Sequence, residues 1–102
     1  MPLMFSYKTL RDVELLKKVI GHEPESMKKA VLKGFKDVDE GTNYHTMIQD
    51  EKGKIKGILY DLSEADLKKI DAYEERYNRV SFTVSGISFY AYILKRKFMK
   101  VK

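Results

Sequence analysis

The chain has 102 residues, which is enough for one domain with a modest core. Its hydrophobic content of 43% and charged content of 34% are typical of a soluble globular protein, and neither end carries an apolar run long enough to span a membrane. The lack of cysteine excludes disulfides, thiol nucleophiles and thiolate zinc sites, and the two histidines, His22 and His45, are too far apart to predict a metal site. The first residues show no basic segment or cleavage site of a signal peptide, so we expect a cytoplasmic protein without a membrane partner.

The net charge of +5 comes from one end of the chain. Residues 95–102 hold five of the 20 basic residues and no acidic residue, so residues 1–94 carry equal numbers of both signs. A dedicated nucleic-acid domain spreads basic side chains over a folded face, with aromatic residues between them. We therefore expect one domain over residues 1–94, a solvated basic tail over residues 95–102, and no specific nucleic-acid partner.

The first third of the chain predicts a strand, a helix and a second strand. Residues 3–7 alternate apolar side chains on one face, as a strand does. Asp12 is placed to cap a helix with an apolar face, and Gly21 is placed to end it. Residues 27–35 favour a strand, although the spacing of their lysines would also suit a helix.

The middle of the chain predicts a hairpin. Residues 44–49 and 55–61 flank the turn-forming residues 50–53, a pattern typical of two antiparallel strands joined by a turn. Within the first of these strands, His45 lies beside Tyr44. This histidine either lines a pocket or is hydrogen-bonded as an ordinary strand residue.

The last third predicts a helix and a second hairpin. Ser63 begins the helix, and Asp66 completes a capping-box pattern three residues later. Residues 80–94 are rich in β-branched and aromatic side chains and predict a hairpin that turns at Ser85 and Gly86. Two short helices among roughly six strands indicate an α+β protein.

Glu74 is the residue that most strongly suggests chemistry. In the second predicted helix, Leu67, Ile70 and Tyr73 recur at helical spacing, and Glu74 falls in the same apolar stripe. Burial disfavours the charged form of a carboxylate, which makes such a residue a candidate proton acceptor near neutral pH. The alternative is that the helix frays here and that Glu74 pairs with Arg76 or Arg79 at the surface.

The loop from Tyr7 to Arg11 joins the first predicted strand to the first helix. Unpaired amides at a helix N-terminus can hold an anion, and Arg11 lies nearby as a partner for a carboxylate. The alternative is an ordinary strand-to-helix turn, tied down by Thr9 and Asp12.

Four segments of the chain together carry a family resemblance. They are Tyr7-Lys8-Thr9-Leu10-Arg11, the aromatic Tyr44, Lys56-Gly57-Ile58-Leu59-Tyr60, and Ile70-Asp71-Ala72-Tyr73-Glu74 with the following Tyr77 and Arg79. In this order they resemble the Tyr-Gly-Ser/Thr-Leu-Arg, central aromatic, Val-x-Gly-x-Leu-Tyr and Leu-Asp-x-x-Glu motifs of the γ-glutamylcyclotransferase-like superfamily. The likeness spans residues 3–94. It is strongest to the small avirulence-induced-gene-like branch, which includes γ-glutamylamine cyclotransferases.

The resemblance implies a small mixed β-barrel with flanking helices and a pocket between the first loop and Glu74. In catalytic members, that acid promotes attack of the substrate's own α-amine on its γ-carbonyl, which closes the lactam 5-oxoproline and releases the attached amine or amino acid. Carried over to this chain, Glu74 is the catalytic acid and base, and the small γ-glutamyl substrate needs neither a cofactor nor a metal. The substrate-binding residues implied are Tyr7, Lys8, Thr9, Leu10, Arg11 and Tyr44.

The chain departs from the family pattern at its binding loop. Lys8 stands where the family has glycine, a residue that permits positive φ and close approach of a ligand. His45-Thr46 also replaces the usual Pro-Gly or Pro-Ala, and Glu75 replaces the glycine that commonly follows the acid. We expect Lys8 to point to solvent, because a long flexible side chain rarely gives up its hydration on an exposed loop. Two functions stay open: an enzyme that processes γ-glutamyl compounds, which we favour, and a binding or interaction module without turnover.

Overall fold

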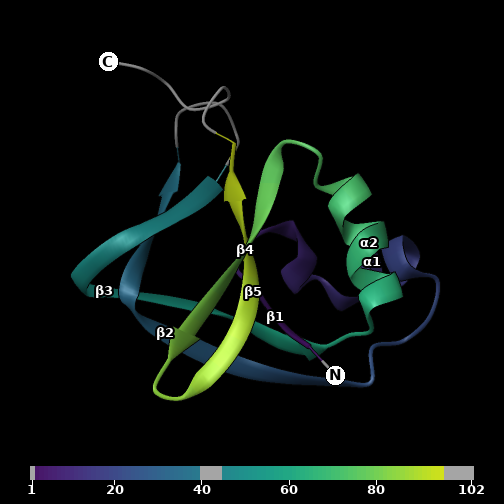
Figure 1. Ribbon diagram of the computed structural model, residues 1–102, viewed down its shortest axis with the longest axis horizontal. Helices are drawn as coiled ribbons and strands as arrows, with labels where there is room; N and C mark the ends of the chain where they lie inside the picture. Colours follow the sequence, from purple (N-terminus) through teal and green to yellow (C-terminus); the bar gives the residue numbers. More distant parts are fainter. Residues whose placement is uncertain (1, 40–44, 96–102) are drawn as a thin grey trace.

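The computed structural model describes residues 2–39 and 45–95, which form an α+β fold around one bent sheet (Figure 1). The elements in chain order are β1 (Leu3–Ser6), the 3₁₀ helix η1 (Thr9–Arg11), α1 (Val13–Ile20), β2 (Ser26–Asp39), β3 (His45–Asp61), α2 (Glu64–Tyr73), β4 (Tyr77–Val84) and β5 (Ile87–Leu94). The sheet order is β2-β3-β1-β5-β4, with β1 and β5 parallel and the other neighbours antiparallel. The predicted α+β class is confirmed. The sheet curves like part of a barrel, and in the described residues β2 and β4 remain as its two edges.

Two groups of buried apolar side chains cover the two faces of this sheet. Neighbouring residues of β1 belong to different groups: Met4 packs with Leu16 and Ile70 of the helices, whereas Phe5 packs with Phe89 inside the curve. This alternation is expected of a strand that is buried on both faces. The two helices α1 and α2 lie side by side at one end of the sheet (Figure 1).

The predicted hairpin in the middle of the chain is wrong. Strand β3 continues through residues 50–53 and pairs with β2 on both sides of them. The pairing register shifts at Gly34, whose φ is +91°, so residues 50–53 form a bulge opposite this glycine. The Asp50 carboxylate accepts a hydrogen bond from the backbone N–H of Lys52 at 3.0 Å. These turn-forming residues therefore shape a bulge in one long strand, and the described residues contain five strands rather than six.

The predicted ends of the helices are confirmed. The Asp12 carboxylate accepts a hydrogen bond from the backbone N–H of Glu14 at 3.0 Å, and Gly21 ends α1 with a φ of +86°. At the start of α2, Ser63 and Asp66 form the reciprocal capping box that their spacing predicts. Both helices thus begin where a side chain can accept hydrogen bonds from backbone amides that would otherwise be unpaired.

A histidine links the end of α1 to the start of α2. In the His22 ring, Nε2 lies 2.7 Å from a carboxylate oxygen of Asp66, and Nδ1 lies 2.7 Å from the carbonyl oxygen of Glu23. Since both partners are acceptors, the ring satisfies both only as the doubly protonated imidazolium. The hydrogen bonds to Asp66 and then to Glu23 raise the pKa of His22. Lys69 adds a second link, because its Nζ donates to the carbonyl of Ile20 at 2.8 Å.

The predicted last hairpin is confirmed as β4 and β5. It turns at Ser85 and Gly86, which have φ values of +52° and +79°. After β5, the backbone N–H of Lys95 donates to the carbonyl of Arg76 at 2.8 Å. Except for Lys95, the predicted basic tail lies outside the described residues. Within residues 2–39 and 45–95, no helix is long and apolar enough to cross a membrane.

Candidate active site

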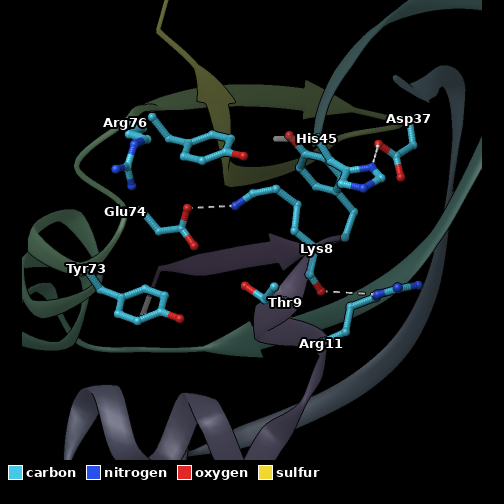
Figure 2. A pocket seen from close by; sticks show the side chains of 10 residues that line it. Lys8, Thr9, Arg11, Asp37, His45, Tyr73, Glu74 and Arg76 are labelled. Atoms are coloured by element: carbon cyan, nitrogen blue, oxygen red, sulfur yellow. Dashed lines mark hydrogen bonds and ion pairs between the residues drawn. The ribbon is translucent and has the colours of Figure 1, made fainter. Parts of the chain in front are cut away.

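A pocket of about 520 Å³ opens between the loop after β1, the end of α2, and the paired ends of β2 and β3 (Figure 2). Its volume lies in the range of small-molecule sites. The residues that line it are Tyr7, Lys8, Thr9, Arg11, Asp37, His45, Tyr73, Glu74, Arg76 and Tyr77. The pocket therefore brings the predicted acid Glu74 together with most of the predicted binding loop.

Glu74 is buried at this pocket, although α2 has already ended. The residue is the C-terminal cap of α2: its N–H donates to the carbonyl of Ile70 at 2.8 Å, and its own carbonyl accepts from the N–H of Tyr77 at 2.9 Å. Its side chain is only 5% exposed. Helical spacing thus predicted the burial of Glu74 correctly, and the alternative of a surface carboxylate on a frayed helix is wrong. The same spacing placed Tyr73 in the apolar stripe, which is wrong, because this side chain is 47% exposed and lines the pocket.

Lys8 does not point to solvent, contrary to the expectation from the sequence. Its Nζ lies 2.8 Å from Oε2 of Glu74, and its side chain is 9% exposed (Figure 2). The ammonium also lies 3.9 Å from the ring centre of Tyr77, a cation–π contact that contributes about 0.5–2 kcal/mol depending on desolvation. Burial lowers the pKa of Lys8, while the charge of Glu74 and the hydrogen bond to it oppose this shift. The paired carboxylate and the aromatic ring replace the hydration that we expected Lys8 to keep.

The backbone at this position does not require glycine. Lys8 has a φ of −115°, which is outside the left-handed region that favours glycine. Its carbonyl accepts hydrogen bonds from the backbone N–H of Arg11 at 3.1 Å and from Nε of Arg11 at 3.2 Å, so the loop is held by its own residues. Lys8 lines the pocket, which stays open with a volume of about 520 Å³.

The predicted binding loop is divided between the pocket and the core. Tyr7, Lys8, Thr9 and Arg11 line the pocket. Leu10 is only 2% exposed and belongs to the core beneath the helices, so its side chain does not line this pocket. The predicted Tyr44 lies outside the described residues.

The helix N-terminus that suggested an anion site is already occupied. The Asp12 side chain accepts from the amides of Glu14 and Leu15 in the first turn of α1. A bound carboxylate would therefore have to rely on the groups that line the pocket itself. Arg11 is one of these, at the loop edge of the pocket.

Strands β2 and β3 supply the wall opposite Glu74, as Figure 2 shows. His45 lies there with Nδ1 3.3 Å from a carboxylate oxygen of Asp37. Both alternatives for His45 are thus realised, because it is hydrogen-bonded and also lines the pocket. Asp37 was not predicted as a site residue, since the predicted strand stopped at Phe35 whereas β2 continues to Asp39. The sequence spacing could have predicted its position, because Asp37 lies two residues beyond the buried Phe35 and therefore on the same face of the strand.

The pocket lining carries charges of both signs. Glu74 and Asp37 supply carboxylates, and Lys8, Arg11 and Arg76 supply cations. A ligand that bears both an ammonium group and a carboxylate, such as an amino-acid derivative, matches this lining. Among the described residues, no group of three or more histidine, aspartate or glutamate side chains lies close enough together to hold a metal ion.

The bent sheet with two helices at one end, and the pocket between the first loop and Glu74, match what the family resemblance of the sequence implies. The family model described as "Gamma-glutamyl cyclotransferase, AIG2-like" matches residues 4–101. The chain belongs to this family. A comparison with curated proteins finds no match.

Solved structures share the fold at low sequence identity. The protein At5g39720.1 from Arabidopsis thaliana is 21% identical, with 94% of this chain and 70% of that chain covered and a TM-score of 0.73. A structure named gamma-glutamyl cyclotransferase is 16% identical, with 92% and 66% covered and a TM-score of 0.65. The uncharacterized protein PH0828 from Pyrococcus horikoshii is also 16% identical, with 92% and 78% covered and a TM-score of 0.67. These similarities establish the fold, and the chain spans only about two thirds of the named cyclotransferase.

Proposed function

We propose that the protein cyclises a γ-glutamyl amine or γ-glutamyl amino acid to 5-oxoproline and releases the attached amine. Glu74 acts as the general base and then as the general acid. The observation that carries this proposal is the position of the buried Glu74 carboxylate, which shares one pocket with the loop that includes Tyr7 and Thr9. Membership of the family supports the same class of reaction.

The proposed reaction needs one proton acceptor, which later returns the proton. The Glu74 carboxylate takes a proton from the substrate's α-ammonium, and the resulting amine attacks the γ-carbonyl carbon. A new C–N bond closes the five-membered ring, and negative charge develops on the carbonyl oxygen. The carbonyl re-forms as the original amide C–N bond breaks, while Glu74 gives its proton to the leaving nitrogen. The ring nitrogen gives up its remaining extra proton through Glu74 to the released amine, so the products are 5-oxoproline and the protonated amine.

The pocket has to supply positioning more than reactive groups. Both reacting groups belong to one molecule, and a well-oriented intramolecular attack has an effective molarity of about 10⁵–10⁸ M. The loop that carries Thr9 and Arg11 lies on the side of the pocket where a substrate carboxylate would be held, and the wall formed by Asp37 and His45 faces the opposite side. In this arrangement, the leaving amine would lie toward Asp37 and His45.

Replacement of Glu74 tests the proposal. Glu74→Gln keeps the shape of the side chain and removes the proton acceptor, so we expect 5-oxoproline formation to fall by about 10²–10⁴-fold. The matched control is Glu75→Gln, which removes an exposed carboxylate next in the chain and should turn over like the unchanged protein. The measurement is 5-oxoproline release from a panel of γ-glutamyl amines and dipeptides. Equal turnover by the Glu74 and Glu75 variants would reject Glu74 as the catalytic group.

A second candidate function is binding of γ-glutamyl compounds without turnover. The observation in its favour is the 2.8 Å contact between Lys8 and Glu74, because the proposed base already carries an ammonium partner. This function predicts that calorimetry detects binding of γ-glutamyl compounds, while neither the unchanged protein nor Glu74→Gln forms 5-oxoproline.

A further inference from the structure

The ammonium group of Lys8 lies in a cage of four other side chains. Its Nζ is 2.8 Å from Oε2 of Glu74, and it is 3.9, 5.6 and 5.8 Å from the ring centres of Tyr77, Tyr7 and Tyr92. A carboxylate together with the electron-rich faces of aromatic rings is a surrounding that binds ammonium groups well. We call these four side chains the ammonium cage.

Contacts that do not involve Lys8 hold Tyr7, Tyr92 and the backbone of Glu74 in place within the ammonium cage. The Tyr7 hydroxyl donates to the backbone carbonyl of Tyr92, and the Tyr92 hydroxyl donates to the Asp71 carboxylate at 2.6 Å. The backbone of Glu74 is fixed as the cap of α2. Burial raises the pKa of both Tyr7 and Tyr92, so these rings stay neutral and add no charge to the cage. An empty cage should therefore keep its shape and its affinity for a cation.

We propose that the ammonium cage is a binding site for a primary ammonium group, and that Lys8 occupies it in the free protein as a built-in competitor of the substrate. The first half of this inference concerns the cage alone. The second half rests on the proposed function, in which the substrate's α-ammonium has to reach Glu74. For that group to bind, the Lys8 side chain has to leave the cage.

The geometry makes this competition direct. A group that gives its proton to Glu74 has to come within about 2.6–3.2 Å of the carboxylate, which is the distance that Lys8 Nζ already holds. Two ammonium groups in one small cage would repel each other. The Lys8 side chain can swing toward the open pocket seen in Figure 2, while Arg11 holds the Lys8 carbonyl and keeps the backbone in place.

The first experiment tests the cage without any substrate. Lys8→Ala removes the resident ammonium, and n-propylammonium restores the missing part of the lysine side chain. We expect calorimetry to show binding of n-propylammonium to Lys8→Ala at least tenfold tighter than to the unchanged protein or to Lys18→Ala, which truncates an exposed lysine of α1. Neutral 1-propanol should not bind, and adding Glu74→Gln to Lys8→Ala should abolish the binding. Failure of n-propylammonium to bind folded Lys8→Ala would show that the cage is not a binding site for an ammonium group.

The second experiment tests the competition. Lys8→Ala should bind γ-glutamyl amines about tenfold more tightly than the unchanged protein, measured by calorimetry and, where turnover occurs, as a lower KM. n-Propylammonium should compete with the substrate in this variant. Weaker substrate binding by Lys8→Ala would show that Lys8 helps to hold the substrate, and would overturn the competitor role. If neither the unchanged protein nor Lys8→Ala forms 5-oxoproline, the proposed function is wrong. Binding of n-propylammonium still shows whether the cage is an ammonium site.

A measurement on the unchanged protein covers the case in which Lys8→Ala does not fold. The ε-methylene protons of Lys8 lie near the Tyr77 ring, so ring currents should shift their NMR signals away from ordinary lysine positions. Adding a γ-glutamyl amine should move these signals back toward ordinary positions as Lys8 leaves the cage. A substrate that binds while the Lys8 signals stay unchanged would contradict the proposal.

Discussion

Removing only the charge of Lys8 should destabilise the protein strongly. In Lys8→Met the stem is kept, but the Glu74 carboxylate remains inside the pocket wall without its ammonium partner. The two side chains are only 9% and 5% exposed, so the pair is buried rather than superficial. Breaking a buried ion pair by removing one partner costs about 3–5 kcal/mol, a large share of the roughly 5–15 kcal/mol that stabilises a domain of this kind.

A double-mutant cycle separates this pair from other effects of the substitutions. The assay is urea unfolding near neutral pH of Lys8→Met, Glu74→Gln and the double variant, with Lys18→Met as an exposed control. With a urea dependence of about 2 kcal/mol per M, the unfolding midpoint of Lys8→Met should fall by about 2 M. The double variant should be more stable than the sum of the two single effects predicts, by about 1–3 kcal/mol. Additivity within about 0.5 kcal/mol, or a Lys8→Met variant as stable as Lys18→Met, would show that the buried ion pair does not stabilise the protein.

Two further predictions concern the fold. The pKa of His22 is raised by Asp66, so the link between the helices should contribute fully below the ordinary histidine pKa of about 6.5 and be lost as pH rises through the raised value. His22→Gln should therefore be less stable than the unchanged protein at mildly acidic pH and equally stable at alkaline pH in urea unfolding, and a pH-independent difference would contradict this link. Gly53→Ala should destabilise by about 1–3 kcal/mol, because its Cβ would lie 2.4 Å from the carbonyl oxygen of Phe35 in the bulge. An unfolding midpoint unchanged by Gly53→Ala would show that the bulge relaxes freely.

Features that depend on local contacts were predictable from the sequence. Asp12, Gly21 and Ser63 act within one turn of the helices that they limit, so the helix ends followed from residue type and spacing. The prediction of a central hairpin was wrong because the residue types at 50–53 are favoured both in turns and in bulges. The partner strand decides between the two, and here β2 provides Gly34 opposite the bulge.

The burial of Glu74 was predictable because the helical periodicity of the sequence reports which residues are buried. Glu74 follows the helical spacing of α2 closely enough that its burial could be inferred. The surroundings of Lys8 come from residues far along the chain, since its partner Glu74 is 66 positions away and Tyr77 lies beyond that. No pattern near Lys8 reports those contacts. The pocket position of Asp37 likewise depends on how far β2 extends, which pairing with β3 determines.

The identity of the product distinguishes intramolecular cyclisation from every hydrolytic alternative. In heavy-oxygen water, the unchanged protein should convert a γ-glutamyl amine to 5-oxoproline without incorporating the heavy oxygen, because the attacking group is the substrate's own amine. Mass spectrometry of the product measures this directly. Glutamate that carries the heavy oxygen, or no product from any γ-glutamyl compound, would contradict the proposed role of Glu74 as the proton-transferring group of a cyclisation.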